Sequence, residues 1–434
     1  MCIRDRNGSV TTIHDCIFTQ NSANYGGVLA AERNGTVTID NGTFSGNTAI
    51  LNGGTLYANA QCTVRINNSS LIGNRAINDG IMLASDSSTI KVYNSNFSNN
   101  RAGDDGGVVY VYDNSTIIIN SCNSDNNRAE DSGGTVYGRK HSTVIISEST
   151  VNNCSAQNDG GSVSILQDSH ATIEASDFIN NSADTGGVVR VYFRSTANIT
   201  NSRFSENTAK ISGGVMVVYK TSTVRVQMSN FTFNMAGFGG VSFTLQNSTV
   251  EFEICEFHNN RAEFDGGVIK VRQQSAVTVT GSTFKDNTAD NGGVLYVQGS
   301  NAILETSSFD HNSARDKGGV IYVIDNCTIS IYLGTFSENT AENDGGVMAL
   351  NGSITSIESS HFTGNRARHN GGVIGIQKSS IRILRCMFNL STAESSGGSI
   401  HATSSSVKIN NSSFTDNSAS DNGGVVDALS LIHI

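Results

Sequence analysis

The carboxylates best placed to do chemistry recur just before a repeated Gly-Gly pair. Asp105, Asp159, Asp265 and Asp344 each stand directly before the first glycine of such a pair. Carboxylate oxygens are calcium ligands, so the series could supply cation sites. In other repeats, however, Lys317, Asn, Ser or Phe fills the same position, and the calcium-binding Gly-Gly-x-Gly-x-Asp nonapeptide does not occur. The pattern therefore predicts turn residues and no metal site.

The histidines could act as general acids or bases, but their spacing does not favour a catalytic group. His141, His170, His258 and His311 are scattered, and no nucleophile or carboxylate recurs beside them. An enzyme that cleaves polysaccharides also needs a cleft beneath long loops, whereas the repeats described below vary in length by one residue only. We therefore expect a flat surface without a concave pocket, no catalytic residue, no enzyme activity and no cofactor.

Eight cysteines raise the question of a disulfide framework. Cys16, Cys122, Cys255 and Cys386 hold the same place in their repeats, but at least four repeats separate each from the next. Repeats stacked about 4.8 Å apart would keep these residues ~19 Å apart, whereas a disulfide spans roughly 7 Å between Cα atoms. No spacing typical of a zinc site occurs either. The cysteines are therefore predicted to be small buried thiols.

A third set of chemically capable side chains is aromatic and cationic, and we call it the Tyr/Arg band. Its members follow the first glycine of a pair by four or six residues. They are Tyr110, Tyr112, Tyr137, Arg190, Tyr192, Tyr219, Lys270, Arg272, Tyr296 and Tyr322. Such a band could stack on sugar rings or grip an acidic polymer. The competing interpretation is structural, because Tyr suits β-strands and stacks with itself between neighbouring strands.

The composition is that of a repetitive, β-rich chain. Its 434 residues include 45 Gly but no Pro and no Trp, and 15% are charged, well below the roughly 25% of typical globular proteins. The formal net charge of −10 disfavours nucleic acid as a partner, because nucleic-acid sites need a basic face. No stretch approaches the roughly 18 apolar residues of a transmembrane helix. Hydrophobic residues make up 37%, which is enough for a continuous core.

The chain repeats itself every 26 or 27 residues, in sixteen units. Most units carry Phe-x-x-Asn-x-Ala followed by Gly-Gly, as in Phe178, Asn181, Ala183 and Gly186; the Ala is present in all sixteen units, the Asn in 14 and the Phe in 13. After the glycines, apolar residues fall at every second position, as at Val189 and Val191, which indicates a strand with one buried face. A second alternating strand precedes each Phe, with room for only a short third strand at the Phe itself. No helical period is present.

This pattern predicts an all-β parallel β-helix, or β-solenoid, of about 16 coils, in which one coil covers the apolar face of the next. Identical positions then stack along the coils. The Asn positions are expected to form an amide ladder that satisfies backbone carbonyls at the bends. We assign this structural ladder to Asn21, Asn47, Asn100, Asn181, Asn260, Asn339 and Asn417.

The repeated Phe-x-x-Asn and Gly-Gly-Val-Ile, as in Gly266-Gly267-Val268-Ile269, resemble the repeats of the polymorphic outer membrane protein family first described in chlamydiae. The resemblance covers roughly residues 9 to 428. It implies a right-handed parallel β-helix displayed on a cell surface, often as an adhesin. The chain departs from the family where Val replaces the Ala of Gly-Gly-Ala-Ile, and nothing resembling a C-terminal outer-membrane barrel is present in it.

The two ends break the repeat. Residues 1–6 and 429–434 resemble translated adapter sequence, so we expect a fragment in which residues 7–428 form a single β-helix domain between non-native ends. The favoured function is a non-catalytic extracellular or outer-membrane-associated adhesin or stalk. Its expected partners are cell-surface glycans or proteins of a host or neighbouring cell, without nucleic acid and without a transmembrane segment. A pectin lyase-like polysaccharide lyase or hydrolase, and a purely structural envelope protein, remain the alternatives.

Overall fold

The computed structural model describes residues 3–6 and 8–429, and for residues 3–6 the backbone alone. Every element in this described part is a β-strand, and none of its segments is a helix able to cross a membrane. It divides into two compact units. One runs up to Lys210 and includes Gly214–Val224, and the other comprises Ile211–Gly213 and continues from Arg225. The single domain expected over residues 7–428 and the non-native ends at 1–6 and 429–434 stay predictions; residues 1, 2, 7 and 430–434 lie outside the described part.

Each coil contains four strands, one more than the sequence predicts. In the first unit a representative coil consists of β17 (Val109–Tyr112), β18 (Thr116–Asn120), β19 (Asn123–Asp125) and β20 (Arg128–Ala129). In the second unit it consists of β45 (Leu295–Gln298), β46 (Asn301–Glu305), β47 (Ser308–Asp310) and β48 (Ser313–Ala314). The additional two-residue strand contains the Ala of the repeat, whose side chain is fully buried at Ala129 and Ala314.

The Tyr/Arg band lies on first strands of the coils, which together form the first sheet. In the first unit these strands are β1 (Ile3–Arg6), β5 (Leu29–Glu32), β9 (Leu56–Asn59), β13 (Met82–Ser85), β17, β21 (Val136–Arg139), β25 (Val163–Leu166), β29 (Val189–Tyr192) and β33 (Met216–Tyr219). In the second unit they are β37 (Ser242–Leu245), β41 (Ile269–Arg272), β45, β49 (Ile321–Ile324), β53 (Met348–Asn351), β57 (Ile374–Gln377), β61 (Ile400–Thr403) and β65 (Val426–Leu429).

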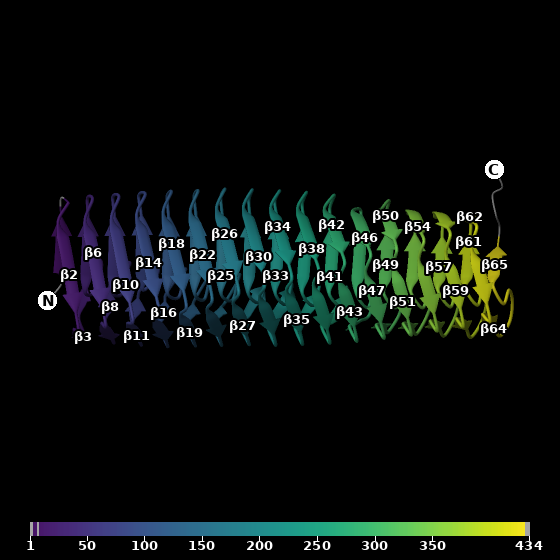
Figure 1. Cartoon of the computed structure of the whole chain (residues 1–434), viewed down its shortest axis with the longest axis horizontal. Helices are drawn as coiled ribbons and strands as arrows, with labels where there is room; N and C mark the ends of the chain where they lie inside the picture. The colour runs from purple at the N-terminus through teal and green to yellow at the C-terminus, as the bar shows by residue number, and fades with distance from the viewer. Residues whose placement is uncertain (1–2, 7, 430–434) are drawn as a thin grey trace. The chain divides into compact units, whose positions relative to one another are not determined.

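Within each unit every strand pairs in parallel with the corresponding strand of the adjacent coil. Figure 1 shows such strands as arrows lying side by side. β17 pairs with β21 so that Tyr110 lies opposite Tyr137, and β45 pairs with β49 so that Tyr296 lies opposite Tyr322. The repeat length sets this register, because a slip by one residue would turn the buried face outward. The predicted all-β parallel solenoid is thereby confirmed.

Stacked phenylalanines fill the interior. In the second unit the rings of Phe257 and Phe284 lie 4.5 Å apart between centroids with planes 4° apart. The same near-parallel stacking continues through Phe309 and Phe336. In the first unit Phe178 and Phe204 stack at 5.2 Å. Each ring is buried by its neighbours in the adjacent coils, so a coil depends on those neighbours for its core.

The asparagines form a hydrogen-bonded ladder inside each unit. Oδ1 of Asn47 accepts from both the backbone N and Nδ2 of Asn21 at 2.9 Å, and Asn47 Nδ2 donates to the carbonyl of Phe18. Such pairs continue at Asn100, Asn181, Asn260 and Asn339, and Asn417 accepts from the backbone N of Ser391. Each amide thus satisfies a bend carbonyl and a backbone donor that the ladder would otherwise leave unpaired.

The glycine pair is needed at a close approach between coils. Gly106 has a φ of +66°, and a Cβ there would lie 2.4 Å from the carbonyl oxygen of Val109. A Cβ on Gly107 would lie 2.1 Å from the carbonyl oxygen of Gly134 in the next coil. A side chain at either position would therefore displace backbone, which explains why the pair recurs at the entry to the first strand.

Candidate binding groove on the first sheet

The Tyr/Arg band falls into two rows on the outer face of the first sheet. The second residue of each first-sheet strand forms what we call the outer row, which includes Tyr110, Tyr137 and Arg190 in the first unit and Lys270, Tyr296 and Tyr322 in the second. The fourth residue forms the rim row, which includes Tyr112, Tyr192, Tyr219 and Arg272. The alternation of a strand places both rows on the same face.

The outer row is far more buried than an exposed band would be. Tyr110 and Tyr137 are each 5% exposed, Tyr296 is 7% exposed and Lys270 is 4% exposed. Arg190, Tyr322 and the four rim-row residues named above are half-buried. The alternation alone does not predict this burial, since it tells only which face a side chain occupies. The outer row therefore contributes to packing as well as to the surface.

In the first unit the band residues stack on and hydrogen-bond to one another. Tyr110 stacks on Tyr137 with ring centroids 5.3 Å apart, in a cluster with Leu83 and Leu166. Arg190 forms an ion pair with Asp159 at 2.9 Å, and its guanidinium donates to the hydroxyl of Tyr219 at 2.6 Å. A half-buried guanidinium with both an anion and an aromatic neighbour is internally compensated.

Lys270 is compensated in the same way in the second unit. Its Nζ lies 2.7 Å from a carboxylate oxygen of Asp265. The same atom lies 3.8 Å above the ring centroid of Phe238 and 4.6 Å from that of Tyr296. Burial lowers the pKa of Lys270, while the neighbouring Asp265 raises it. Its charge is directed into the protein, so it is not a free cation for an external acidic polymer.

In the first unit, turns at both ends of the first strands flank a shallow groove on the sheet. In the first unit one cavity of about 340 Å³ is lined on one side by residues that precede the glycines and on the other by residues that follow the strands. They include Asn52 and Asp79 on the first side and Asp86 and Asp113 on the second. The expectation of a flat sheet without a concave pocket is therefore wrong. Because the coils have nearly equal lengths, their turns stack into walls. No projecting loop is needed to form them.

The floor and one end of this cavity are aromatic. Tyr57, Tyr110 and Tyr112 line it together with Tyr25, whose ring lies 5.1 Å from that of Tyr57. Arg139 also lines it, 5.0 Å from the ring centroid of Tyr112. Aromatic surface beside a few polar groups is typical of ligand pockets. Tyr57 and Arg139 have the strand positions of the band and belong to its outer and rim rows, whereas Tyr25 precedes a glycine pair and was not predicted.

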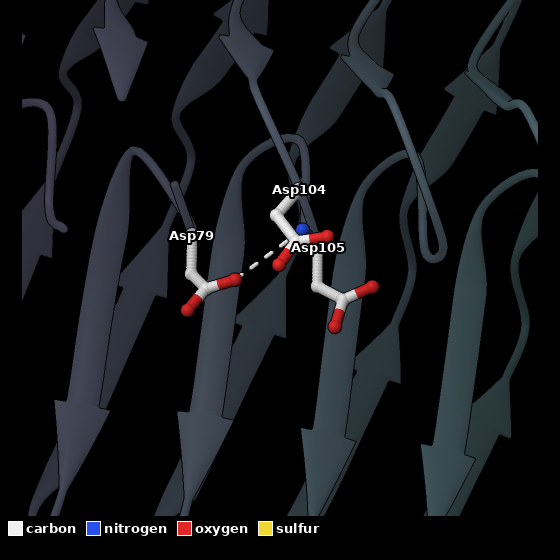
Figure 2. A group of neighbouring side chains, drawn as sticks. All are labelled: Asp79, Asp104 and Asp105. Carbon is white, nitrogen blue, oxygen red and sulfur yellow. Dashed lines mark hydrogen bonds between the residues drawn. The ribbon is translucent and has the colours of Figure 1, made fainter. Parts of the chain in front are cut away.

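Three carboxylates gather at the wall of this groove. Asp79, Asp104 and Asp105 place one oxygen each within 4.8 Å of one another, and Figure 2 shows the backbone N of Asp105 donating to the Asp79 carboxylate. Asp105 in turn accepts from the backbone N of Ser132 at 3.1 Å. By residue type the group could hold a cation. Its hydrogen bonds are those of a turn ladder, in which the side chain before the glycine caps the next coil.

Burial raises the pKa of two of these carboxyl groups, so they are weaker acids than an ordinary aspartate. It raises the pKa of Asp79 to about 6. Asp105 is 8% exposed, and burial together with the charges of Asp104 and Asp131 raises its pKa to about 8. A carboxyl group in such surroundings is held partly protonated near neutral pH. The sequence could not predict this, because the same residue type before other glycine pairs has different neighbours.

The second unit contains a cavity of its own on its first-sheet strands, of about 260 Å³. It lies where the outer row passes from Tyr322 to Ala349, Gly375 and His401. Sequence reasoning missed it because it followed the aromatic residues of the row. The available signal was two consecutive coils with a small residue at a position that is bulky in several other coils.

Comparison with known proteins identifies the family to which this architecture belongs. A family model described as a right handed beta helix region matches residues 135–312 and 266–430, together more than half of the chain. The chain belongs to the right-handed β-helix family. The Chlamydia polymorphic membrane protein repeat matches residues 94–112, which include Phe97, Asn100 and the Gly106-Gly107 pair. A search of curated proteins gave no significant match.

The remaining reactive side chains of the β-helix have structural surroundings. Of the described cysteines, all are free thiols and six are buried, while Cys16 is half-buried. Burial raises the pKa of Cys122 and of Cys255 to about 11, so these thiols are poor nucleophiles at neutral pH. Within residues 8–429, Asp79, Asp104 and Asp105 are the one group of three or more acidic, His or Cys side chains close enough to share a metal ion.

Proposed function

We propose that this β-helix is a cell-surface or secreted adhesin or stalk that binds partners in the groove of its first sheet. The matched polymorphic membrane protein repeat at residues 94–112 supports a surface location, since that family is one of membrane proteins. The groove carries the proposal of binding. It combines tyrosine rings, carboxylates and amides along one concave face, which is the mixture that sugar rings and protein loops both bind.

We propose further that the protein is not an enzyme. Asp79 and Asp105, two of the three carboxylates grouped in its described part, are hydrogen-bonded to the backbone of neighbouring turns. The polysaccharide lyase or hydrolase alternative requires an acid and a base that both face a substrate. Incubation with neutral and acidic polysaccharides, followed by measurement of new reducing ends and unsaturated products, tests this. Release of either product that is lost in a groove variant would overturn the proposal.

The binding role is tested by two tyrosines of equal exposure. Tyr25 is 46% exposed and lines the cavity of the first unit, whereas Tyr332 is 44% exposed and lies outside both cavities. Loss of one stacking ring costs about 1 kcal/mol, which is about a fivefold loss of affinity. We expect Tyr25→Ala to weaken binding to immobilised glycans or intact cells about fivefold and Tyr332→Ala to leave it unchanged. Equal effects of the two substitutions would contradict a role for the groove.

A further inference from the structure

The outer row of the second unit is interrupted by two small residues. Pairing places Tyr322 opposite Ala349, Ala349 opposite Gly375, and Gly375 opposite His401. The row is bulky at Lys270 and Tyr296 earlier in the same unit. Two neighbouring coils therefore lack a large side chain, and the adjacent coils on either side present Tyr322 and His401 at the two ends of the gap.

The surrounding side chains do not fill the space above the two small residues, so a cavity is left there. Its volume is about 260 Å³, and Ala349 and Gly375 form its floor. A Cβ on Gly375 would lie 3.1 Å from Cβ of Asp344, so the wall that carries Asp344 already stands close to the floor. Ligand pockets for drug-sized molecules measure roughly 300–1,000 Å³. A slightly smaller, open cavity fits a single ring.

Hydrogen-bonding groups line both walls of the cavity. Residues that precede glycines form one wall, and residues that end first-sheet strands form the other. The first wall contains Lys317, Asp344 and Asn370, and the second contains Asn351, Gln377 and Thr403. Amides and hydroxyls both donate and accept hydrogen bonds. They therefore match a ligand whose hydroxyl groups also do both.

The charges of the pocket offset one another. Lys317 is half-buried and forms no ion pair within the described part of the chain. Asp344 supplies one carboxylate, whose Oδ1 accepts from the backbone N and Nδ2 of Asn370 at 3.2 and 3.1 Å. His401 is held by Asp427 at 3.0 Å and by the Thr403 hydroxyl at 3.3 Å. Of the charged lining residues, the Lys317 ammonium and the Asp344 carboxylate offset each other, and the Asp427 carboxylate is engaged by His401.

We propose that this pocket binds one uncharged sugar ring of a glycan. Tyr322 closes one end with an aromatic side chain that can pack on the apolar face of such a ring, and the two polar walls bind its hydroxyls. This inference deepens the proposed function and rests on it, because it names the ligand class of a second cavity on the first-sheet strands. It concerns residues of the second unit, so it can be tested apart from Tyr25.

The test fills the pocket with tyrosine, the residue that nearby coils carry at the same position of the outer row. Ala349→Tyr restores an aromatic residue to the outer row beside Tyr322. Ala30→Tyr is the matched control, because Ala30 has the same row position, lies opposite Tyr57 and lines neither cavity. Gln377→Ala is a second variant at an exposed strand end. The probes are methyl glucoside, methyl galactoside and methyl mannoside, with glucuronic acid and glucosamine as charged counterparts, measured on the full chain by calorimetry and ligand-observed NMR.

We expect at least one methyl hexoside to bind and both charged sugars to bind at least fivefold more weakly. Ala349→Tyr should reduce hexoside binding at least tenfold and Gln377→Ala severalfold, while Ala30→Tyr leaves it unchanged. Absence of hexoside binding, preference for a charged sugar, or equal loss in Ala349→Tyr and Ala30→Tyr would overturn the inference. If cells or glycans still bind through Tyr25 in that case, the proposed function stands and only the sugar pocket fails.

Discussion

Asp105 shows how burial and neighbouring charges raise the pKa of a turn residue. Its pKa of about 8 in the folded chain exceeds the roughly 3.9 of an unfolded aspartate. The folded state therefore binds this proton more tightly than the unfolded state. The resulting stabilisation is fully present below the unfolded pKa, and it is lost as the pH rises from about 4 through about 8. The carboxylate thus weakens the first unit at alkaline pH.

Asp105→Asn should remove this loss, because an amide does not ionise and its oxygen can still accept from the backbone N of Ser132. Asn already fills this position at Asn52 and Asn291. We expect the free energy of unfolding at pH 9 to rise by about 1–3 kcal/mol, with little change at pH 4. Urea unfolding at both pH values measures it. Asp86→Asn, which removes the same charge from an exposed turn, is the control, and a gain at pH 4 equal to that at pH 9 would contradict the explanation.

At the scale of the element, the Asn ladder is interrupted where Ser391 replaces an asparagine. Asn339 donates through its backbone N and Nδ2 to Oδ1 of Asn365, and the next rung in the series would be residue 391. There the hydroxyl of Ser391 instead donates to the carbonyl of Asn389 at 3.2 Å. Ser391 is fully buried, so the missing amide cannot be replaced by free solvent.

Ser391→Asn should therefore stabilise the second unit by about 1 kcal/mol, the net value of one added hydrogen bond. Asn365→Ser creates a second interruption beside the first and should destabilise by about 1–3 kcal/mol, because buried backbone groups lose their partner. The midpoint of urea unfolding measures both. The reciprocal pair serves as its own control: a decrease in stability for Ser391→Asn would show that the column has adapted its packing to serine.

The elements were largely predictable and the groove was not, for a physical reason. Spacing identifies inward residues such as Val109 and stacked ones such as Asn181, because a constant repeat superposes the same position in every coil. It does not tell how high a turn stands beside the sheet. The burial of Tyr110 and Lys270 and the cavity above Gly375 depend on that height, and on which side chains meet across coils.

At the scale of the whole molecule, stability should vary from coil to coil, because each strand pairs with strands of the adjacent coils. β2 (Val10–His14) pairs with β6 (Thr36–Asp40), and most of its residues are exposed or half-buried. By contrast β22 (Thr143–Ser147) is paired on both sides, with β18 and with β26 (His170–Glu174). The second unit has the same contrast between β62 (Ser406–Asn410), which has no fully buried residue, and β42 (Ala276–Thr280).

Hydrogen exchange of the full chain should follow these differences. Amides of β2 and β62 open with their own coil, whereas amides of β22 and β42 exchange only when several coils open together. We expect peptides from β2 and β62 to exchange at least a hundredfold faster than those from β22 and β42 at pH 7, measured by mass spectrometry. Peptides from the exposed turn at Asp86 provide the fast reference. Uniform protection from β2 to β62 would show instead that the coils unfold as one cooperative body and that nearest-neighbour contacts do not limit their stability.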